Sequence, residues 1–372
     1  TTVIDGGAGI DTLDASLVTV GNAGVFANFE TLSINTTNAD LDLALVNKST
    51  FTTIAIDGAS TSTVRNVSTS QSLTVNATAG ATTTLLFKDV AGTADAYTIN
   101  FNADNATSTN AGTVVINKIE TVTVNSVGKT GVTNNTITLT DDAAKSLVIT
   151  GDKALTVNFA TTFGSTTPAD ATNGLGVSTI DASAATGAVT ITNTTAVKVA
   201  FNGLTIKGGT AADSITLNQK ATVDAGAGDD TIVTSGAGGT LTGGAGKDMF
   251  NIAASVLGGG ELTEATGVVK VTITDLTAGD KIIFADKGTE VFNKIKLDVS
   301  TASNLDDALD IALAGDGSSN GIINWFQYAG NTYIVEDVLA VTSAGAGDMV
   351  VKINGSVDLT NSTLSGVDLT IA

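Results

Sequence analysis

The chain has 372 residues and a formal net charge of −20, with 42% hydrophobic residues, 4% aromatic residues and neither cysteine nor histidine. This composition excludes disulfides, thiolate sites, histidine-based catalytic triads and the usual ligand sets of zinc and haem, and so acidic a chain is not expected to bind nucleic acid. The remaining ligand chemistry is that of Asp, Glu and backbone carbonyl oxygens, which suits calcium or magnesium.

The first two predicted segments are a glycine–aspartate motif in residues 1–16 and Thr-rich β modules in residues 17–202. Within the second segment, alternating apolar and polar residues predict short half-buried strands. The clearest runs are 31–34, 72–75, 97–101, 137–140, 155–159 and 189–192. A faint repeat relates 29–35 to 119–125, each followed by a Leu-Thr-Val-Asn segment at Leu73 or Leu155, which suggests stacking. The sequence leaves a continuous β-solenoid and separate β-sandwiches both open, and a mixed, elongated arrangement is expected.

Residues 203–260 are rich in glycine and carry the strongest pattern. Residues 208–216 (GGTAADSIT), 225–233 (AGAGDDTIV) and 243–251 (GGAGKDMFN) share it with residues 6–14 (GGAGIDTLD). All four resemble the RTX nonapeptide, Gly-Gly-x-Gly-x-Asp-x-apolar-x, which forms a calcium-binding parallel β-roll. Glycine permits the tight turns, Asp supplies a charged oxygen, and the apolar residue begins a strand. The apolar residues Leu13, Ile215, Ile232 and Phe250 are therefore predicted to lie in the core.

The RTX resemblance implies calcium as the cofactor and indicates its ligands. The candidates are Gly6, Gly9, Asp11, Asp14, Gly208, Thr210, Asp213, Asp224, Gly226, Gly228, Asp230, Gly243, Ala245 and Asp248. Asp213, Asp230 and Asp248 are 17 and 18 residues apart. Because two nonapeptides make one turn of the roll, these aspartates should stack along one edge. The other edge, near 218–220 and 235–239, lacks Asp and is expected to be empty or weakly occupied.

Departures from the RTX pattern limit this prediction. Ala211 replaces the third glycine of the first copy, and Ala225 replaces the first glycine of the second copy, so weaker sites are expected there. An isolated glycine–aspartate pair is equally consistent with an ordinary turn. The prediction of calcium binding therefore rests on three copies in register.

Residues 261–372 are predicted to form a β-rich cap that contains one helix. The helix is expected over 304–314, with Ser303 or Asn304 as its N-cap and Gly315 after its end. The strand–turn–strand at 272–284 and the strands at 325–335 and 348–353 resemble the closing part of RTX C-terminal regions. The apolar ending, 367–372, resembles an uncleaved type I secretion signal.

Together these features resemble the RTX-type surface-layer (S-layer) proteins of Gram-negative bacteria, in particular their C-terminal lattice-forming portion. The resemblance implies a secreted, extracellular structural protein that assembles with copies of itself into a two-dimensional lattice when calcium binds. In that family an upstream portion anchors to cell-surface lipopolysaccharide. The chain starts at Thr1 without an initiator Met, so such a portion is expected to precede it. No transmembrane segment and no catalytic activity are expected.

Three other interpretations compete with the S-layer interpretation. An RTX adhesin or biofilm-matrix fragment would share the calcium chemistry, but it should show a ligand pocket or tandem near-identical domains. An RTX protease or lipase would need a catalytic His or a nucleophile elbow. A glycosidase would need only two carboxylates. The candidate pair Asp141–Asp142, however, reads as a turn between strands, and Trp325 and Tyr328 read as core residues.

Overall fold

The computed structural model describes residues 2–35, 40–58, 61–104, 107–164, 176–192, 203–255, 257, 268–286, 288, 290–314, 321–337 and 347–372. The all-β fold class predicted from the sequence is confirmed, and the described residues contain a single α-helix. The chain divides into two compact units, Thr1–Thr205 (unit 1) and Ile206–Ala372 (unit 2).

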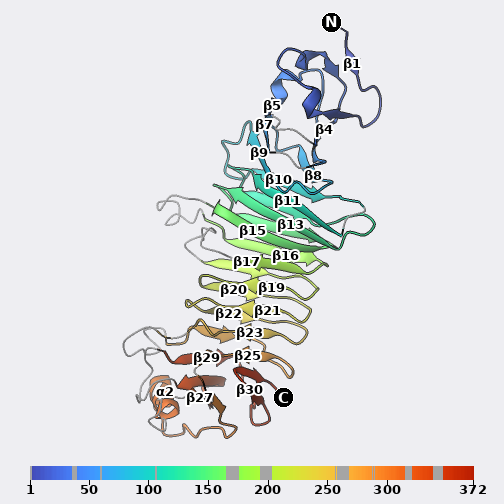
Figure 1. Ribbon diagram of the computed structural model, residues 1–372. Helices are drawn as coiled ribbons and strands as arrows, with labels where there is room; N and C mark the ends of the chain where they lie inside the picture. The colour runs from blue at the N-terminus through green and yellow to red at the C-terminus, as the bar shows by residue number, and fades with distance from the viewer. Residues whose placement is uncertain are drawn as a thin grey trace. The chain divides into compact units, whose positions relative to one another are not determined.

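Unit 1 is a parallel β-solenoid in which successive strands alternate between two sheets (Figure 1). The first sheet contains, in order, β2 (Thr12–Asp14), β4 (Thr31–Ile34), β6 (Thr53–Ile56), β8 (Ser72–Val75), β10 (Ala96–Phe101), β12 (Thr121–Asn125), β14 (Ser146–Gly151) and β16 (Thr179–Ala185). The second contains β5 (Asp40–Asp42), β7 (Ser62–Val67), β9 (Thr82–Phe87), β11 (Ser108–Val115), β13 (Asn134–Asp141), β15 (Ala154–Phe163) and β17 (Val189–Thr192). Two short strands, β1 (Ile4–Asp5) and β3 (Phe26–Ala27), pair separately, and β18 (Leu204–Lys207) contains the unit boundary.

The parallel register stacks like residues on like residues along unit 1. One aliphatic ladder joins the strands of the first sheet through Leu13, Leu32, Ile54, Leu73, Ile99, Val124 and Ile149. Every member is almost completely buried. The two sheets therefore share a thin aliphatic core, and the alternating threonines lie outside it. The sequence left a β-solenoid and separate β-sandwiches both open. The described residues of unit 1 form the coils of a solenoid.

The coils also explain the faint internal repeat. Segments 29–35 and 119–125 contain β4 and β12, which occupy equivalent positions in the first sheet. The Leu-Thr-Val-Asn segments at Leu73 and Leu155 fall in β8 and β15, which belong to different sheets. Only the first resemblance therefore reflects a repeated position in the coil.

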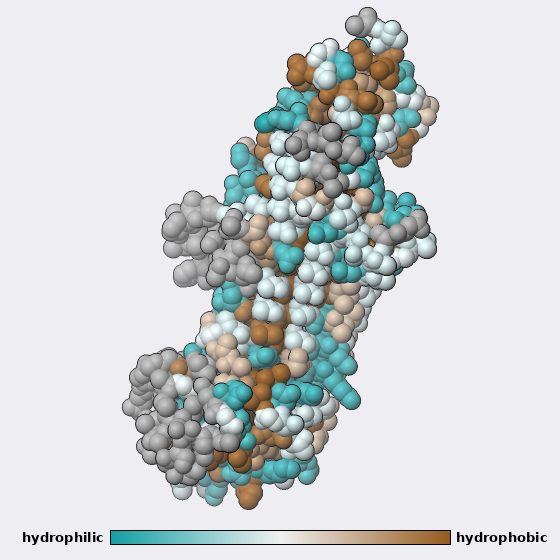
Figure 2. All heavy atoms as spheres, in the orientation of Figure 1, coloured by the Kyte–Doolittle hydropathy of each residue, from teal (hydrophilic) through white to brown (hydrophobic). Residues whose placement is uncertain are grey.

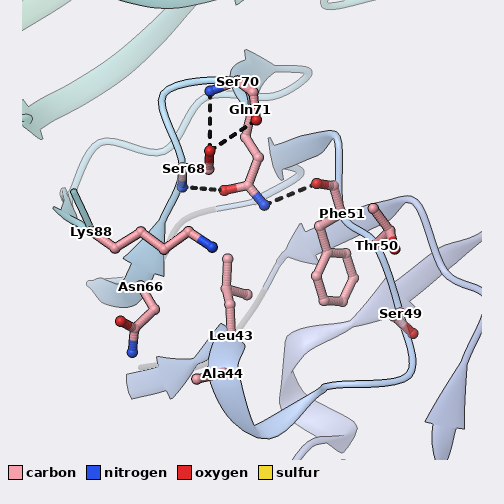
Figure 3. A pocket seen from close by; sticks show the side chains of 10 residues that line it. All are labelled: Leu43, Ala44, Ser49, Thr50, Phe51, Asn66, Ser68, Ser70, Gln71 and Lys88. Atoms are coloured by element: carbon pink, nitrogen blue, oxygen red, sulfur yellow. Dashed lines mark hydrogen bonds between the residues drawn. The ribbon is translucent and has the colours of Figure 1, made fainter. Parts of the chain in front are cut away.

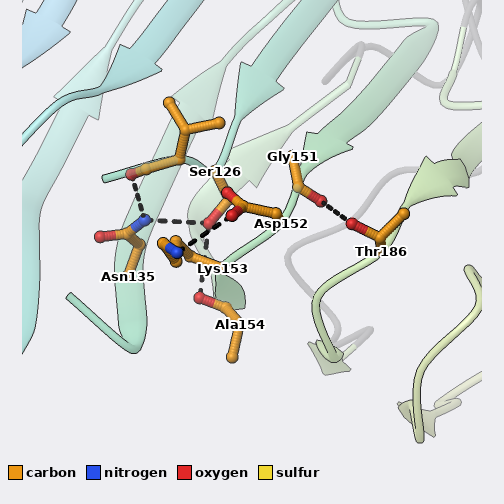
Figure 4. A network of polar contacts seen from close by, with 8 residues as sticks. Ser126, Asn135, Gly151, Asp152, Lys153, Ala154 and Thr186 are labelled. Atoms are coloured by element: carbon orange, nitrogen blue, oxygen red, sulfur yellow. Dashed lines mark hydrogen bonds and ion pairs between the residues drawn. The ribbon is translucent and has the colours of Figure 1, made fainter. Parts of the chain in front are cut away.

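A polar network holds the corner between β12 and β13 (Figure 4). Asn135 is fully buried, and its Nδ2 donates to Ser126 Oγ and to the carbonyl of Val127, both at 3.0 Å. The amide of Lys153, one coil later, donates to the carbonyl of Ser126 at 3.0 Å. These bonds satisfy buried backbone groups where the chain turns from one sheet to the other.

Unit 2 begins with narrower parallel coils and ends in a mixed cap. One sheet runs β20 (Ala221–Asp224), β22 (Gly239–Thr242), β24 (Val271–Ile273), β29 (Met349–Ile353), β28 (Asn331–Asp337), β27 (Ile322–Tyr328) and β26 (Val291–Phe292). The other runs β19 (Ser214–Thr216), β21 (Thr231–Val233), β23 (Met249–Asn251), β25 (Lys281–Ile283), β31 (Asp368–Thr370) and β30 (Thr363–Ser365). Antiparallel pairing begins at β28 in the first sheet and at β31 in the second.

The predicted helix and core residues of unit 2 are confirmed. Helix α2 spans Leu305–Leu313, and its N-cap Asn304 accepts a hydrogen bond from the amide of Asp307 at 2.8 Å. Its apolar face packs on a cluster that includes Phe326 and Val335. Ile215, Ile232 and Phe250 in unit 2 are fully buried, and Leu13 in unit 1 is only 2% exposed. Among the described residues, no helix has the length and apolar character needed to cross a membrane.

Candidate metal centre

Three glycine–aspartate loops lie one above another in unit 2. They are 208–213, 225–230 and 243–248, which lead into β19, β21 and β23. The amide of Ala227 donates to the carbonyl of Gly209, and the amide of Ala245 donates to the carbonyl of Gly226, both at 3.0 Å. The loops thus stack through the same kind of parallel bonding as the strands that follow them.

Glycine is required in these loops for two reasons. Gly228 and Gly246 have φ values of 125° and 145°, a region that L side chains rarely adopt. A Cβ atom on Gly228 would also lie 2.5 Å from the carbonyl carbon of Ala211, and one on Gly246 would overlap the carbonyl oxygen of Gly228. The turns can therefore pack at coil spacing only when these positions lack a side chain.

The aspartates at the ends of the loops form a hydrogen-bonded column. The amide of Asp213 donates to Asp230 Oδ1 at 2.6 Å, and the amide of Asp230 donates to Asp248 Oδ1 at 2.9 Å. The amide of Asp248 donates in turn to Asp280 Oδ1 at 2.9 Å. The second oxygen of Asp213 accepts from the amide of Gly209 at 2.6 Å. Stacking of the three predicted aspartates along one edge is therefore present in the structure.

The column places carboxylates where ionisation is costly. Asp213, Asp230, Asp248 and Asp280 are each no more than 3% exposed. Burial, together with the neighbouring charges of Asp213 and Asp248, raises the pKa of Asp230 to about 7, although the hydrogen bond from the Asp213 amide acts to lower it. Burial also raises the pKa of Asp248 to about 6. In the described part of the chain, Asp230 Oδ2 is buried without a hydrogen-bond partner, and no ion pair reaches Asp230 or Asp248.

Asp275 and Asp280 extend the site beyond the residues predicted from the sequence. Asp275 accepts from the amides of Gly243 and Gly244 at 3.0 and 2.7 Å, while Asp280 Oδ2 accepts from the amide of Thr277 at 2.6 Å. The signal was present, because Gly279–Asp280 is followed by an apolar strand as in the RTX copies. It was missed because an insertion places Asp280 32 residues after Asp248, outside the expected spacing.

The structure brings together some of the predicted ligands and separates others. Gly208, Thr210, Asp213, Gly226, Gly228, Asp230, Gly243, Ala245 and Asp248 all lie in the three stacked loops. Asp224 lies at the end of β20 with its side chain exposed, and its carbonyl accepts from the amide of Gly208 at 2.8 Å. The other four candidates, Gly6, Gly9, Asp11 and Asp14, belong to unit 1.

The N-terminal motif has its own local partners. Asp11 leads into β2, and its amide donates to Glu30 Oε2 at 2.9 Å, while Asp11 Oδ2 is buried without a hydrogen-bond partner. Asp14 instead accepts from the amide of Ser16 at 2.8 Å and from Asn35 Nδ2 at 2.7 Å. Burial opposes ionisation of Asp14, but these hydrogen bonds outweigh it and lower its pKa. Asp11 with Glu30 therefore resembles the unit 2 column, whereas Asp14 uses Oδ1 to cap the turn at Ser16 and Oδ2 to accept from Asn35.

Other acidic residues of unit 1 have surroundings that differ from those of the unit 2 column. Glu120 accepts from the amide of Asp95 at 2.8 Å and lies 3.9 Å from Lys145 Nζ. Asp141 is fully buried at the end of β13, where burial raises its pKa to about 8. The next residue, Asp142, accepts from the amide of Lys118 at 2.9 Å. Asp141 ends β13, and its Oδ1 accepts from the amide of Ala143 at 2.9 Å, which agrees with the turn expected at Asp141–Asp142.

The unit 2 column fits a hard divalent cation in its donor chemistry. No group of three Asp, Glu, His or Cys side chains arranged to hold a metal was found among the described residues. A cation here would therefore need backbone carbonyls as well as carboxylates, as calcium accepts. The carbonyls of the stacked loops can serve because each oxygen has two lone pairs and the coil-to-coil bonds use one. Asp230 Oδ2, which has no hydrogen-bond partner among the described residues, could contribute a carboxylate oxygen to such a ligand set.

In the presence of a chelator, the free energy of unfolding of unit 2 is expected to fall as pH rises from about 4 to about 7. Between those values the folded chain keeps a proton on Asp230, with its pKa of about 7, that the unfolded chain has released, so raising the pH favours unfolding. Urea unfolding followed by fluorescence of the single tryptophan, Trp325, measures this slope. Asp230→Asn should flatten the slope, and an equal slope in both proteins would contradict the assignment.

Neither a scan of protein-family models nor a search of curated proteins found a match to this chain.

Proposed function

We propose that this chain is a calcium-dependent structural protein, exported by type I secretion, whose copies assemble into a surface layer outside a Gram-negative cell. The observation that carries the calcium part is the buried aspartate column of unit 2, in which Asp230 Oδ2 has no partner among the described residues. The assembly and export parts rest on the resemblance to RTX S-layer proteins and on the features described next.

The residues of the column would couple calcium binding to folding. When bound, calcium would supply the positive charge that the column lacks. The carboxylates of Asp230 and Asp248 would bind it together with carbonyls of the stacked glycine loops, and these groups converge only when the coils are stacked. Without the cation, their burial and mutual repulsion oppose folding at neutral pH. A chain of this kind can stay unfolded at low cytosolic calcium and fold at millimolar extracellular calcium.

Exposed apolar side chains in unit 1 support self-association. Six large apolar residues among the first 45 are exposed: Val3, Ile4, Ile10, Leu17, Val20 and Leu45. Ile10 and Val20 are each 84% exposed. Figure 2 shows hydrophobic atoms on the surface of this part of unit 1. Exposed apolar side chains can take part in protein–protein contacts. The strands β2 and β5 also end their sheets, so their outer backbone groups are available for pairing.

Negative-stain electron microscopy of the purified chain, with millimolar calcium and with chelator, tests the proposal when combined with circular dichroism. Ordered sheets or regular oligomers that form only with calcium are the expected result. A chain that folds with calcium but remains monomeric would overturn the lattice proposal and favour the adhesin interpretation. If calcium changed neither folding nor association, the glycine–aspartate loops would be ordinary turns.

A further inference from the structure

A pocket of about 300 Å³ lies in unit 1, at the corner that follows β5, β7 and β9 (Figure 3). It is lined by Leu43, Ala44, Ser49, Thr50, Phe51, Asn66, Ser68, Ser70, Gln71 and Lys88. Three successive coils contribute these residues. The volume suits one small polar molecule.

The charge of this pocket is opposite to that of the chain. Lys88 is the single charged residue in the lining, in a chain with 37 acidic residues. The backbone amide of Lys88 donates to the carbonyl of Val67 at 2.9 Å, while the side chain extends over the pocket (Figure 3). Within the described residues, Lys88 Nζ makes no hydrogen bond or ion pair. An unpaired ammonium group facing a hollow favours an anionic ligand.

The acidic side chains of β5 make their hydrogen bonds and ion pairs with residues other than Lys88. Asp40 pairs with Arg65, with Nε and Oδ1 2.8 Å apart. Asp42 accepts from Asn66 Nδ2 at 2.6 Å and from the amide of Ala44 at 2.9 Å. Among the described residues, neither carboxylate forms an ion pair with Lys88.

The polar side chains that line the pocket are held in place by hydrogen bonds to one another and to the backbone. Gln71 Oε1 accepts from the amide of Ser68 at 2.8 Å, and Gln71 Nε2 donates to the carbonyl of Phe51 at 2.9 Å. The hydroxyls of Ser68 and Ser70 are 2.8 Å apart. Hydroxyl groups held in this way can exchange hydrogen bonds with a ligand at little cost in entropy.

Neutral residues precede β6 and β8 beside the pocket. The strands align Thr31, Thr53 and Ser72, so Gln71 and Thr52 occupy the position that Glu30 holds in the first coil. The two coils beside the pocket thus carry an amide and a hydroxyl where the first coil carries a carboxylate. On the other side, Leu43 and Phe51 supply an apolar surface.

We propose that this pocket binds one acidic sugar residue, that is, a saccharide unit that carries a carboxylate or a phosphate. Lys88 would pair with the acidic group, the serine–glutamine wall would bind ring hydroxyls, and Leu43 with Phe51 would contact the apolar C–H face of the ring. The proposal rests on unit 1 alone and does not depend on calcium binding in unit 2.

Calorimetric titration of the full chain with glucuronate, glucose, glucose 6-phosphate and acetate, at fixed millimolar calcium, tests this site. Glucuronate or glucose 6-phosphate should bind with a dissociation constant of about 1 mM, at least about fivefold more tightly than glucose or acetate, and increasing salt should weaken the binding. The tighter of the two acidic sugars identifies the acidic group as carboxylate or phosphate.

Lys88→Gln should remove the preference for the acidic sugar and leave binding of glucose unchanged. Lys118→Gln, at another exposed lysine of unit 1, is the matched control and should retain the preference. Circular dichroism verifies that both variants fold. Equal binding of acidic sugar and glucose to the parent chain, equal binding of acetate and glucuronate, or an equal loss in both variants would overturn the proposal.

Discussion

Asp230→Asn is expected to weaken calcium binding to unit 2 at least about tenfold, which corresponds to about 1.4 kcal/mol. The substitution keeps an oxygen for the amide of Asp213, which donates to Asp230 Oδ1 at 2.6 Å. It removes the negative charge and the unpartnered Oδ2 that would face the cation. Calorimetric titration of calcium into chelator-treated protein measures the change. Asp248→Asn should have a similar effect, because Asp248 supplies the next carboxylate of the column.

In the absence of calcium, the same substitution should raise the free energy of unfolding of unit 2 or leave it unchanged. At pH 8, burial of an ionised Asp230 opposes folding, since its pKa is raised to about 7. The chelated Asp230→Asn protein is therefore expected to resist urea at least as well as the parent, although it is less stable in calcium. A variant that lost stability in chelator yet kept full calcium affinity would identify Asp230 as a structural turn residue.

Asp358→Asn provides the matched control for both measurements. Asp358 is an exposed acidic residue of unit 2 whose Oδ1 accepts from the amide of Thr360 at 3.0 Å. Its replacement changes the net charge of the chain by the same amount as the replacement of Asp230. Calcium affinity should remain within about twofold of the parent value, so any loss specific to Asp230 reflects its place in the column.

Gly246→Ala is expected to destabilise unit 2 by about 3 kcal/mol or more. At φ 145° an alanine is strained by about 1–3 kcal/mol, and its Cβ would also overlap the carbonyl oxygen of Gly228 in the preceding loop. That loop cannot retreat easily, because the amides of Ala227 and Ala245 bind it to its neighbours. Urea unfolding followed by Trp325 fluorescence should show a lower midpoint, both with calcium and with chelator.

Gly330→Ala separates backbone strain from the loss of loop packing. Gly330 lies in the turn between β27 and β28 with φ 79°, and a Cβ there would meet no atom within 4 Å. Only the left-handed conformation is penalised at this position, which costs about 1–2 kcal/mol. Equal effects of the two substitutions would show that close stacking of the glycine loops does not contribute to stability.

Local pattern predicted much of the fold because side-chain periodicity directly sets which residues face the core. Alternation located β4 and β8 at their observed bounds, and helical spacing with an Asn cap located α2 to within one residue at each end. The aspartate column followed from the spacing of Asp213, Asp230 and Asp248, because a coil of constant length returns equivalent residues to the same edge.

Positions that depend on pairing between distant coils could not be inferred in this way. Asp280 joins the column only because the long segment after β23 returns to the same sheet as β25. Asp224 directly precedes the second motif copy in sequence, yet it lies at the end of β20 with its side chain exposed. The pocket beside Lys88 is assembled from three coils, and none of its segments has a pattern of its own.

Residue types and short-range spacing were enough to predict the all-β class, the strand-facing pattern and the helix, and they restrict the donors for any cation to oxygen atoms. The solenoid form of unit 1, the burial of Asp230 Oδ2 without a hydrogen-bond partner and the position of Lys88 beside a pocket without acidic residues became visible in the folded structure. The reason is physical: burial, strand register and the pairing of charges arise from contacts between coils, which local spacing does not specify.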